Sequence, residues 1–211
     1  KHRGASQAQR AASNQEDKGP IVIFETIVTT RDEAGRDHIA PMGIRHEGGF
    51  IVLSPFRPSA TLEHVLREKC AVVNYTDDVR IFAGCLTGRY DWPTLPVERL
   101  PCRRLAAALA HCEVRLERVQ DDPTRPRLYC REIARVMHGA FGGFNRAQSA
   151  VIEAAILVSR LNMLPQEKID TEMAYLAIGV EKTAGPRELE AWGWLKACIE
   201  EFRGARKESV A

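Results

Sequence analysis

The sequence has no long apolar run. Among its 211 residues the longest uninterrupted apolar stretch is six residues, Leu105 to Ala110, whereas about 20 are needed for a helix to cross a bilayer. With 45% hydrophobic and 27% charged residues, the composition is that of an ordinary globular protein. We therefore expect no membrane partner, and either one large domain or one domain with an added lobe.

An excess of charge of either sign is also missing. Thirty Lys and Arg residues face 28 Asp and Glu residues, for a formal net charge of +2, so no nucleic-acid partner is expected. Lysine is scarce, since 23 of the basic residues are Arg and only 7 are Lys. Arginine suits fixed bidentate contacts with carboxylate or phosphate, which fits an oxyanion-binding surface. A GC-rich codon usage produces the same excess, and the sequence leaves both explanations open.

Metal-binding and disulfide patterns are absent as well. The six cysteines include no C-x-x-C pair, and the six histidines include no H-x-x-x-H or H-E-x-x-H pair. We expect no bound metal, reduced cysteines in a cytoplasmic protein, and structural or surface roles for the histidines. Residues 1–19 contain no apolar side chain larger than alanine. We expect a disordered tail there, without the apolar core of a signal peptide.

Short β-branched runs follow this tail and predict strands. They occupy residues 21–30, 38–46, 49–54 and 71–76, and a long hairpin is predicted over 112–121 and 127–137. Turn residues at 31–36 and 47–49 join the first three strands into an antiparallel meander, which argues against a nucleotide-binding doubly wound sheet. Short helices are predicted at 59–69 and 77–86, and a proline-broken connection at 92–101.

The last third of the chain is predicted to be helical. Apolar stripes with helical periodicity cover 144–164, a second segment that starts at Pro165, and a third that starts at Gly185. The expected fold class is therefore α+β. The strands are expected to form a β-barrel-like body at 20–140, with a C-terminal three-helix region at 141–205 packed on it.

Two strand segments are candidates for ligand binding. Thr29 and Thr30 end a predicted strand just before a turn. The next strand contains Ala40, Pro41, Met42 and Gly43. Because proline lacks an N–H and glycine weakens pairing, we expect this strand to lie at an edge or to contain a bulge, where backbone groups remain free for a ligand. Protection of an edge strand against aggregation explains the same residues equally well.

Two loops contain residues suited to phosphate. Arg57 lies between prolines, just before a predicted helix that offers the Ser59 and Thr61 hydroxyls. The start of such a helix also provides free N–H groups and a positive dipole. The glycine-rich connection 138–146 ends with Asn145 and Arg146 but matches no established phosphate-loop pattern. An ordinary capped helix and a flexible hinge are the simpler alternatives for these two segments.

Six blocks of the sequence are informative together. They are ETIVTT, APMGI, LSPFRPSATL, VVNYTDDVRIFA, GFNRAQSAVIEAAILVSRL and EKTAGPRELEAWGWL, which span about Ile23 to Phe202. In this order they resemble a domain-of-unknown-function family of the flavin-reductase-like, FMN-binding split-barrel superfamily. The resemblance implies a six-stranded antiparallel split β-barrel of the Greek-key type, with FMN in a groove at the interface of a homodimer and an extra helical region. Members often occur beside genes of methanopterin-linked one-carbon metabolism, which indicates a pathway without naming a reaction.

The resemblance also implies roles for individual residues. Contact with the flavin ring is assigned to Thr29, Thr30, Ala40, Pro41, Met42 and Gly43. The ribityl chain or the ring is assigned to Asn74 and Thr76. The phosphate is assigned to Arg57, Ser59 and Thr61, with Asn145 and Arg146 as contributors.

The implied function is that of an FMN-dependent oxidoreductase acting on an unidentified small organic substrate, such as a pterin or a one-carbon intermediate. Because flavin chemistry takes place on the ring itself, no protein acid or base is required. This fits the absence of a convincing acid–base pair in the sequence. The alternative is a non-catalytic flavin-binding dimer, or a barrel that serves as an interaction module.

Overall fold

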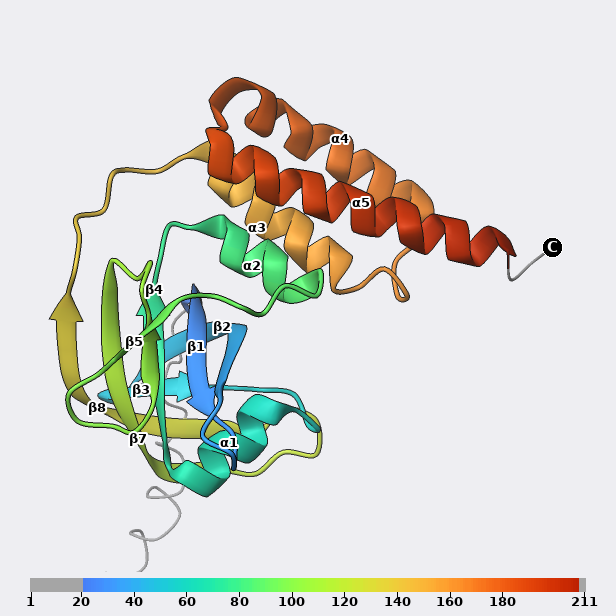
Figure 1. The fold of residues 1–211 in the computed structure, drawn as a ribbon. Coiled ribbons are helices and arrows are strands. Elements are labelled where there is room, and N and C mark those ends of the chain that lie inside the picture. Colours follow the sequence, from blue (N-terminus) through green and yellow to red (C-terminus); the bar gives the residue numbers. More distant parts are fainter. Residues whose placement is uncertain (1–20, 209–211) are drawn as a thin grey trace, which may run out of the picture.

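A computed structural model describes residues 21–208, so the tail predicted at 1–19 lies outside the described residues. Six strands form a closed antiparallel barrel, and a layer of helices lies over one end of it (Figure 1). The barrel strands are β1 (Phe24–Arg31), β2 (Asp37–Glu47), β3 (Phe50–Leu53), β4 (Cys70–Tyr75), β7 (Ala110–Gln120) and β8 (Arg127–Met137). Within residues 21–208, no helix combines the length and the apolar character needed to cross a membrane.

The strands follow one another around the barrel in the order β1-β2-β3-β8-β7-β4. Both tight hairpins predicted from the sequence are confirmed. The first turn contains Gly35 with φ 80°, and the second contains Gly48 and Gly49 with φ 57° and 80°, values that glycine adopts without a steric penalty. β4 pairs with β1 on one side and with β7 on the other, and this closes the barrel.

Apolar residues from all six strands fill the barrel, and α1 (Ala60–Glu68) packs Leu62 and Val65 against them. Ser59 is the N-cap of this helix, because its hydroxyl accepts the Leu62 N–H at 3.3 Å. The helix predicted at 59–69 and its cap are therefore confirmed. α1 lies at the end of the barrel opposite the helical layer (Figure 1).

The helical layer consists of α2 (Val79–Leu86), α3 (Arg146–Val158), α4 (Gln166–Thr183) and α5 (Pro186–Glu208). α2 belongs to the barrel part of the sequence, yet Val79 and Ala83 share one apolar core with Trp192 of α5. The expected three-helix region is therefore corrected: residues 21–208 contain five helices, and four of them form the layer. The sequence predicted a short helix at 77–86, but it could not show against which element the apolar face of α2 would pack.

Residues 92–109, called the covering segment below, lie on the outer face of β4 and β7. They include β5 (Thr94–Pro96) and β6 (Arg103–Leu105), which pair as a two-stranded sheet where only a broken connection was predicted. Buried apolar contacts join this segment to Cys70 and Val72 of β4. These residues alternate along β4 with those that face the barrel interior, as strand geometry requires.

Candidate functional site

The first half of β2 has an unpaired edge. Residues 37–44 pair with β1, whereas pairing with β3 begins only at Ile44. Among the described residues, 37–43 therefore have no strand on their second side, and we call this stretch the β2 edge. Because antiparallel strands direct alternate backbone groups to opposite sides, part of its hydrogen-bonding capacity is left for a ligand. The expectation of an edge in this strand is confirmed for these residues.

Four predicted site residues lie together on the β2 edge, all of them half-buried: Ala40, Pro41, Met42 and Gly43. Two contacts limit the backbone groups and the space that the β2 edge leaves for a ligand. The Met42 carbonyl accepts a hydrogen bond from Thr26 Oγ1 at 2.7 Å. A Cβ added at Gly43 would lie only 2.8 Å from Ile23 Cγ2, so glycine is what allows the chain before β1 to lie over this point.

Two hydroxyls and two imidazoles gather where the β2 edge meets α1. Thr30 Oγ1 lies 3.0 Å from His64 Nδ1, and His38 Nε2 lies 3.2 Å from Thr61 Oγ1. The two imidazole rings are 5.3 Å apart and almost perpendicular. Burial lowers the pKa of both histidines, and for His38 the neighbouring imidazole lowers it further. Both rings are therefore neutral near pH 7.

Arg57 and Ser59 lie in the loop that leads into α1. Arg57 is exposed, and its guanidinium Nη2 donates to Asp121 Oδ1 at 2.8 Å. The Arg57 backbone N–H donates to the Thr124 carbonyl at 2.9 Å, which fixes the loop against the β7–β8 turn. The exposed ion pair contributes little stability, so an anionic ligand could replace Asp121. Through Thr61, the N-terminal end of α1 is joined to the β2 edge, so these predicted residues share one region.

Thr29 and Asn74 are buried beneath the covering segment. Asn74 Nδ2 donates to the Ile27 carbonyl at 3.1 Å and to Thr29 Oγ1 at 2.6 Å, and Asn74 Oδ1 accepts the Leu105 N–H at 2.8 Å. Both side chains are completely buried. The structure thus uses these polar groups to hold β1, β4 and the covering segment together. Their flavin contact stays a prediction, and it would require the covering segment to move.

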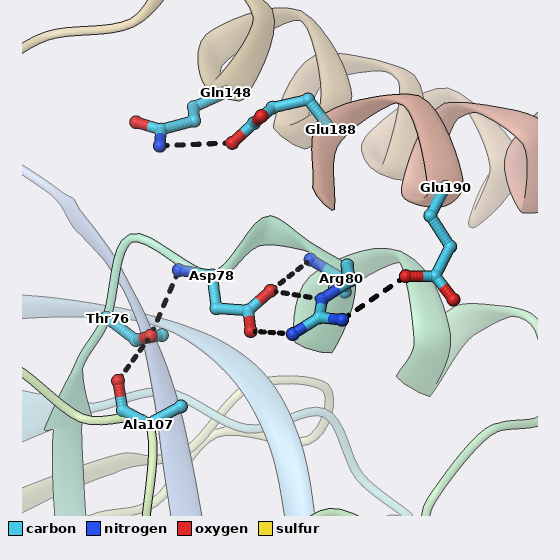
Figure 2. A network of polar contacts seen from close by, with 7 residues as sticks. All are labelled: Thr76, Asp78, Arg80, Ala107, Gln148, Glu188 and Glu190. Atoms are coloured by element: carbon cyan, nitrogen blue, oxygen red, sulfur yellow. Dashed lines mark hydrogen bonds and ion pairs between the residues drawn. The ribbon is translucent and has the colours of Figure 1, made fainter. Parts of the chain in front are cut away.

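Thr76 belongs to a polar network that joins β4, α2 and α5 (Figure 2). Its hydroxyl donates to the Ala107 carbonyl at 3.1 Å and accepts the Asp78 N–H at 3.1 Å. The buried Asp78 carboxylate caps α2 and accepts two side-chain hydrogen bonds from Arg80, at 2.9 and 2.7 Å. Arg80 also donates to Glu190 of α5 at 3.2 Å. This network fixes the helical layer on the barrel.

Asn145 and Arg146 lie at the start of α3. Asn145 Oδ1 accepts the Ala147 N–H at 2.8 Å, and its Nδ2 donates to the Thr183 carbonyl at 3.0 Å, so Asn145 is a structural cap. Arg146 is exposed. Because α3 lies in the helical layer and α1 at the opposite end of the barrel (Figure 1), Arg146 and Arg57 of one chain cannot hold the same phosphate. Arg57 precedes α1 and Arg146 begins α3, and these helices lie at opposite ends of the barrel. The contribution of Asn145 and Arg146 to the phosphate stays a prediction.

His38 and His64 were not expected as part of the candidate site. The available signal was weak: Thr61 and His64 are three residues apart and so lie on one helix face. Nothing in the sequence showed that this face would meet the start of β2.

Comparison with known proteins identifies the family of this chain. Residues 24–139 match the model described as "Protein of unknown function (DUF447) N-terminal domain", and residues 145–197 match "Protein of unknown function (DUF447)". The chain belongs to the DUF447 family. No curated protein matches the sequence.

Solved structures of related fold include a DUF447 protein, the FMN-bound protein MM1853 from Methanosarcina mazei. It is 21% identical, and the match covers 83% of this chain and 94% of that one with a TM-score of 0.72. A putative flavin reductase with a split barrel domain, from Shewanella frigidimarina, is 13% identical over 60% of this chain and 75% of its own, with a TM-score of 0.50. These similarities show the fold, a split-barrel architecture with added helices.

Proposed function

We propose that this DUF447 protein binds FMN and acts as an oxidoreductase on a small organic substrate. The observation that supports the proposal most is common family membership with an FMN-bound protein whose fold matches 83% of this chain. The β2 edge and the α1 end of the barrel provide the groups that such a cofactor needs.

The residues present fit FMN in their chemistry. The rim of the flavin ring carries both hydrogen-bond donors and acceptors, and the backbone of the β2 edge offers both. The phosphate is a dianion, for which Arg57, the Ser59 and Thr61 hydroxyls and the N-terminal end of α1 are suited. Thr29 and Asn74 would support the site indirectly, because their hydrogen bond holds β1 against β4.

Bound FMN would supply hydride or electron transfer at its ring, and the protein's part is binding, orientation and exclusion of water. The neutral imidazoles of His38 and His64 add no positive charge beside the α1 end of the barrel at pH 7. Arg57 is then one of the cations of this region suited to an anion, together with Arg125, whose guanidinium donates to the Ser54 carbonyl.

The homodimer is part of the proposal. Residues Ile21, Val22, Ile23 and Phe24 form a consecutive apolar run in which each residue is 47–61% exposed. A run of this kind beside the β2 edge is typical of a surface that a second copy covers. Sedimentation velocity that gives a monomer at all concentrations would contradict this part.

Titration with FMN tests the proposal directly. We expect binding to change flavin fluorescence and to raise the melting temperature of the protein, because a ligand that binds only the folded state stabilises it. Neither a fluorescence change nor stabilisation at excess FMN would refute flavin binding.

Arg57→Ala tests the phosphate assignment. Loss of a charge-assisted contact should weaken FMN binding by about 1–3 kcal/mol. Arg131→Ala is the matched control, because Arg131 also makes an exposed ion pair, with Glu117 on the β7–β8 hairpin. Equal FMN affinity in wild-type protein and Arg57→Ala would remove Arg57 from the site.

Oxidation of NADH or NADPH in the presence of FMN tests for catalysis, with acceptors that include pterins. Turnover that needs both nicotinamide and an acceptor supports an oxidoreductase. Bound FMN that no nicotinamide and no substrate of the panel reduces or oxidises would favour the non-catalytic flavin-binding dimer.

A further inference from the structure

Two cysteines far apart in the sequence meet between the barrel and the covering segment. Cys70 begins β4, and Cys102 precedes β6. Their sulfur atoms are 3.7 Å apart, close enough for an S–H···S hydrogen bond. The side chains are 3% and 2% exposed and are surrounded by Val72, Val97 and Leu100. No short spacing in the sequence connects these two cysteines, which is why reduced, unpaired thiols were expected.

The hydrogen bond between the two sulfur atoms distinguishes Cys70 from the other cysteines. The S–H of Cys102 and, less strongly, the positive charges of Arg115 and Arg31 lower the pKa of Cys70 by more than burial and the Glu68 carboxylate raise it. The pKa of Cys102 is raised, because it donates its proton toward Cys70. Burial raises the pKa of the remaining cysteines, Cys85, Cys112, Cys130 and Cys198. Thiolate character and an adjacent resolving thiol are the properties of redox-active cysteines.

We propose that Cys70 and Cys102 form a reversible disulfide that fastens the covering segment to β4, with a peroxide as the oxidant. The Cys70 thiolate attacks one peroxide oxygen, the O–O bond breaks, and a sulfenic acid and hydroxide result. The Cys102 sulfur then attacks the sulfenic sulfur, forming the S–S bond and breaking the S–O bond. The hydroxide leaving group takes the Cys102 proton and becomes water. The proton that Cys70 released on forming its thiolate converts the hydroxide of the first step to water. Overall, two thiols lose two electrons and the peroxide becomes two molecules of water.

The covering segment has the features of a part that opens locally. β5 and β6 have three residues each, and many side chains between 94 and 103 are exposed. The segment is anchored partly by the buried Glu113 carboxylate, which accepts the N–H groups of Glu98 at 3.3 Å and Arg99 at 2.9 Å. Short elements held by a few hydrogen bonds open at a lower free energy than the core. Such opening gives a small oxidant access to Cys70, and closure returns Cys102 to it.

The disulfide would change the segment that covers Asn74. It would close a loop across the 32 positions that separate the two cysteines, and cross-links of this kind restrict the unfolded chain. Opening of the covering segment would then be suppressed in the oxidised protein. This inference does not depend on FMN binding, and its test does not use flavin.

The test uses the purified full chain with hydrogen peroxide, followed by alkylation of free thiols and trypsin digestion. Cleavage after Lys69, Arg80, Arg99 and Arg103 releases Cys70 in peptide 70–80 and Cys102 in peptide 100–103. We expect these two peptides to appear linked, with the mass of the pair reduced by two hydrogen atoms. The free thiols should fall from six to four, and dithiothreitol should restore all six.

Cys70→Ser and Cys102→Ser should each abolish the linked pair, whereas Cys198→Ser should leave it unchanged. Before digestion under denaturing conditions, brief treatment of the native protein with trypsin should cut after Arg99 and Arg103 several-fold more slowly in the oxidised protein than in the reduced one. Retention of six free thiols in excess peroxide would overturn the proposal. So would a disulfide of Cys70 with Cys130, or oxidation of Cys70 to the sulfinic acid without a link.

Discussion

Asn74 should be among the most sensitive polar positions of the barrel. Its side chain is completely buried, and it holds β1 through Ile27 and Thr29 and the covering segment through Leu105. Asn74→Ala removes these three hydrogen bonds and a fourth, from Asn74 Nδ2 to the Val72 carbonyl at 3.3 Å, and adds no new partner. The Leu105 N–H, itself on a residue that is 0% exposed, would be left buried and unsatisfied.

The size of the effect follows from the groups left behind. An unsatisfied buried N–H costs about 1–3 kcal/mol, and each further lost hydrogen bond about 1 kcal/mol. Allowing for local relaxation, we expect the free energy of unfolding to fall by about 3 kcal/mol. Thr29→Val is the matched partner, because it removes one hydroxyl with little change in volume and should cost about 1 kcal/mol.

Urea unfolding of the two single variants and of the double variant measures these values and their coupling. We expect a combined loss smaller than the sum, because both changes remove the same Asn74–Thr29 hydrogen bond. Hydrogen exchange at the Leu105 amide should accelerate strongly in Asn74→Ala. A loss below about 1 kcal/mol, which is less than one unsatisfied N–H costs, or an unchanged Leu105 amide, would refute the reasoning.

Three further predictions concern the α1 end of the barrel, the helical layer and α2. Burial lowers the pKa of His64 in the folded protein, so the unfolded chain binds a proton at this residue more readily than the folded chain does. The contribution of His64 to the free energy of unfolding should therefore be complete above about pH 6.5 and decrease as the pH falls below that value. His64→Gln should flatten that part of a urea-measured pH profile. Arg80→Ala should cost about 1–3 kcal/mol in urea unfolding, because the buried Asp78 carboxylate loses its two side-chain hydrogen bonds; a loss no larger than that of an exposed ion pair would contradict this. Gly84→Ala places a Cβ 2.5 Å from Trp92 Cζ2 and should cost about 1–3 kcal/mol with altered tryptophan fluorescence; unchanged fluorescence and stability would show that the contact relaxes freely.

The local elements of the fold were accessible from the sequence. Alternating β-branched residues and glycine turns predicted β1 to β4, and the spacing around the β7–β8 turn predicted that hairpin. These signals are local, since side-chain alternation and turn chemistry act over a few residues. The covering segment was missed as a sheet, because its prolines weaken any strand signal and its apolar residues acquire a partner only from β4.

The candidate site was predictable in part. The unusual residues at 40–43 correctly indicated an edge, because proline and glycine affect pairing wherever they occur. Thr29 and Asn74 also proved to lie together, but as buried supports. Arg57 and Arg146 were both singled out near the start of a predicted helix, and only the tertiary structure shows that these helices, α1 and α3, lie at opposite ends of the barrel.

By itself, the sequence determined the α+β class, the order of most elements and the segments rich in binding chemistry, because these depend on composition and on neighbours along the chain. Only the tertiary structure decided that α2 joins the helical layer, that His38 and His64 meet beside the β2 edge, and that Cys102 comes to lie against Cys70. Each of these depends on contacts between residues far apart in the chain. Such contacts form where closure of the barrel and burial of apolar faces bring distant segments together, and no local pattern encodes which segments those are.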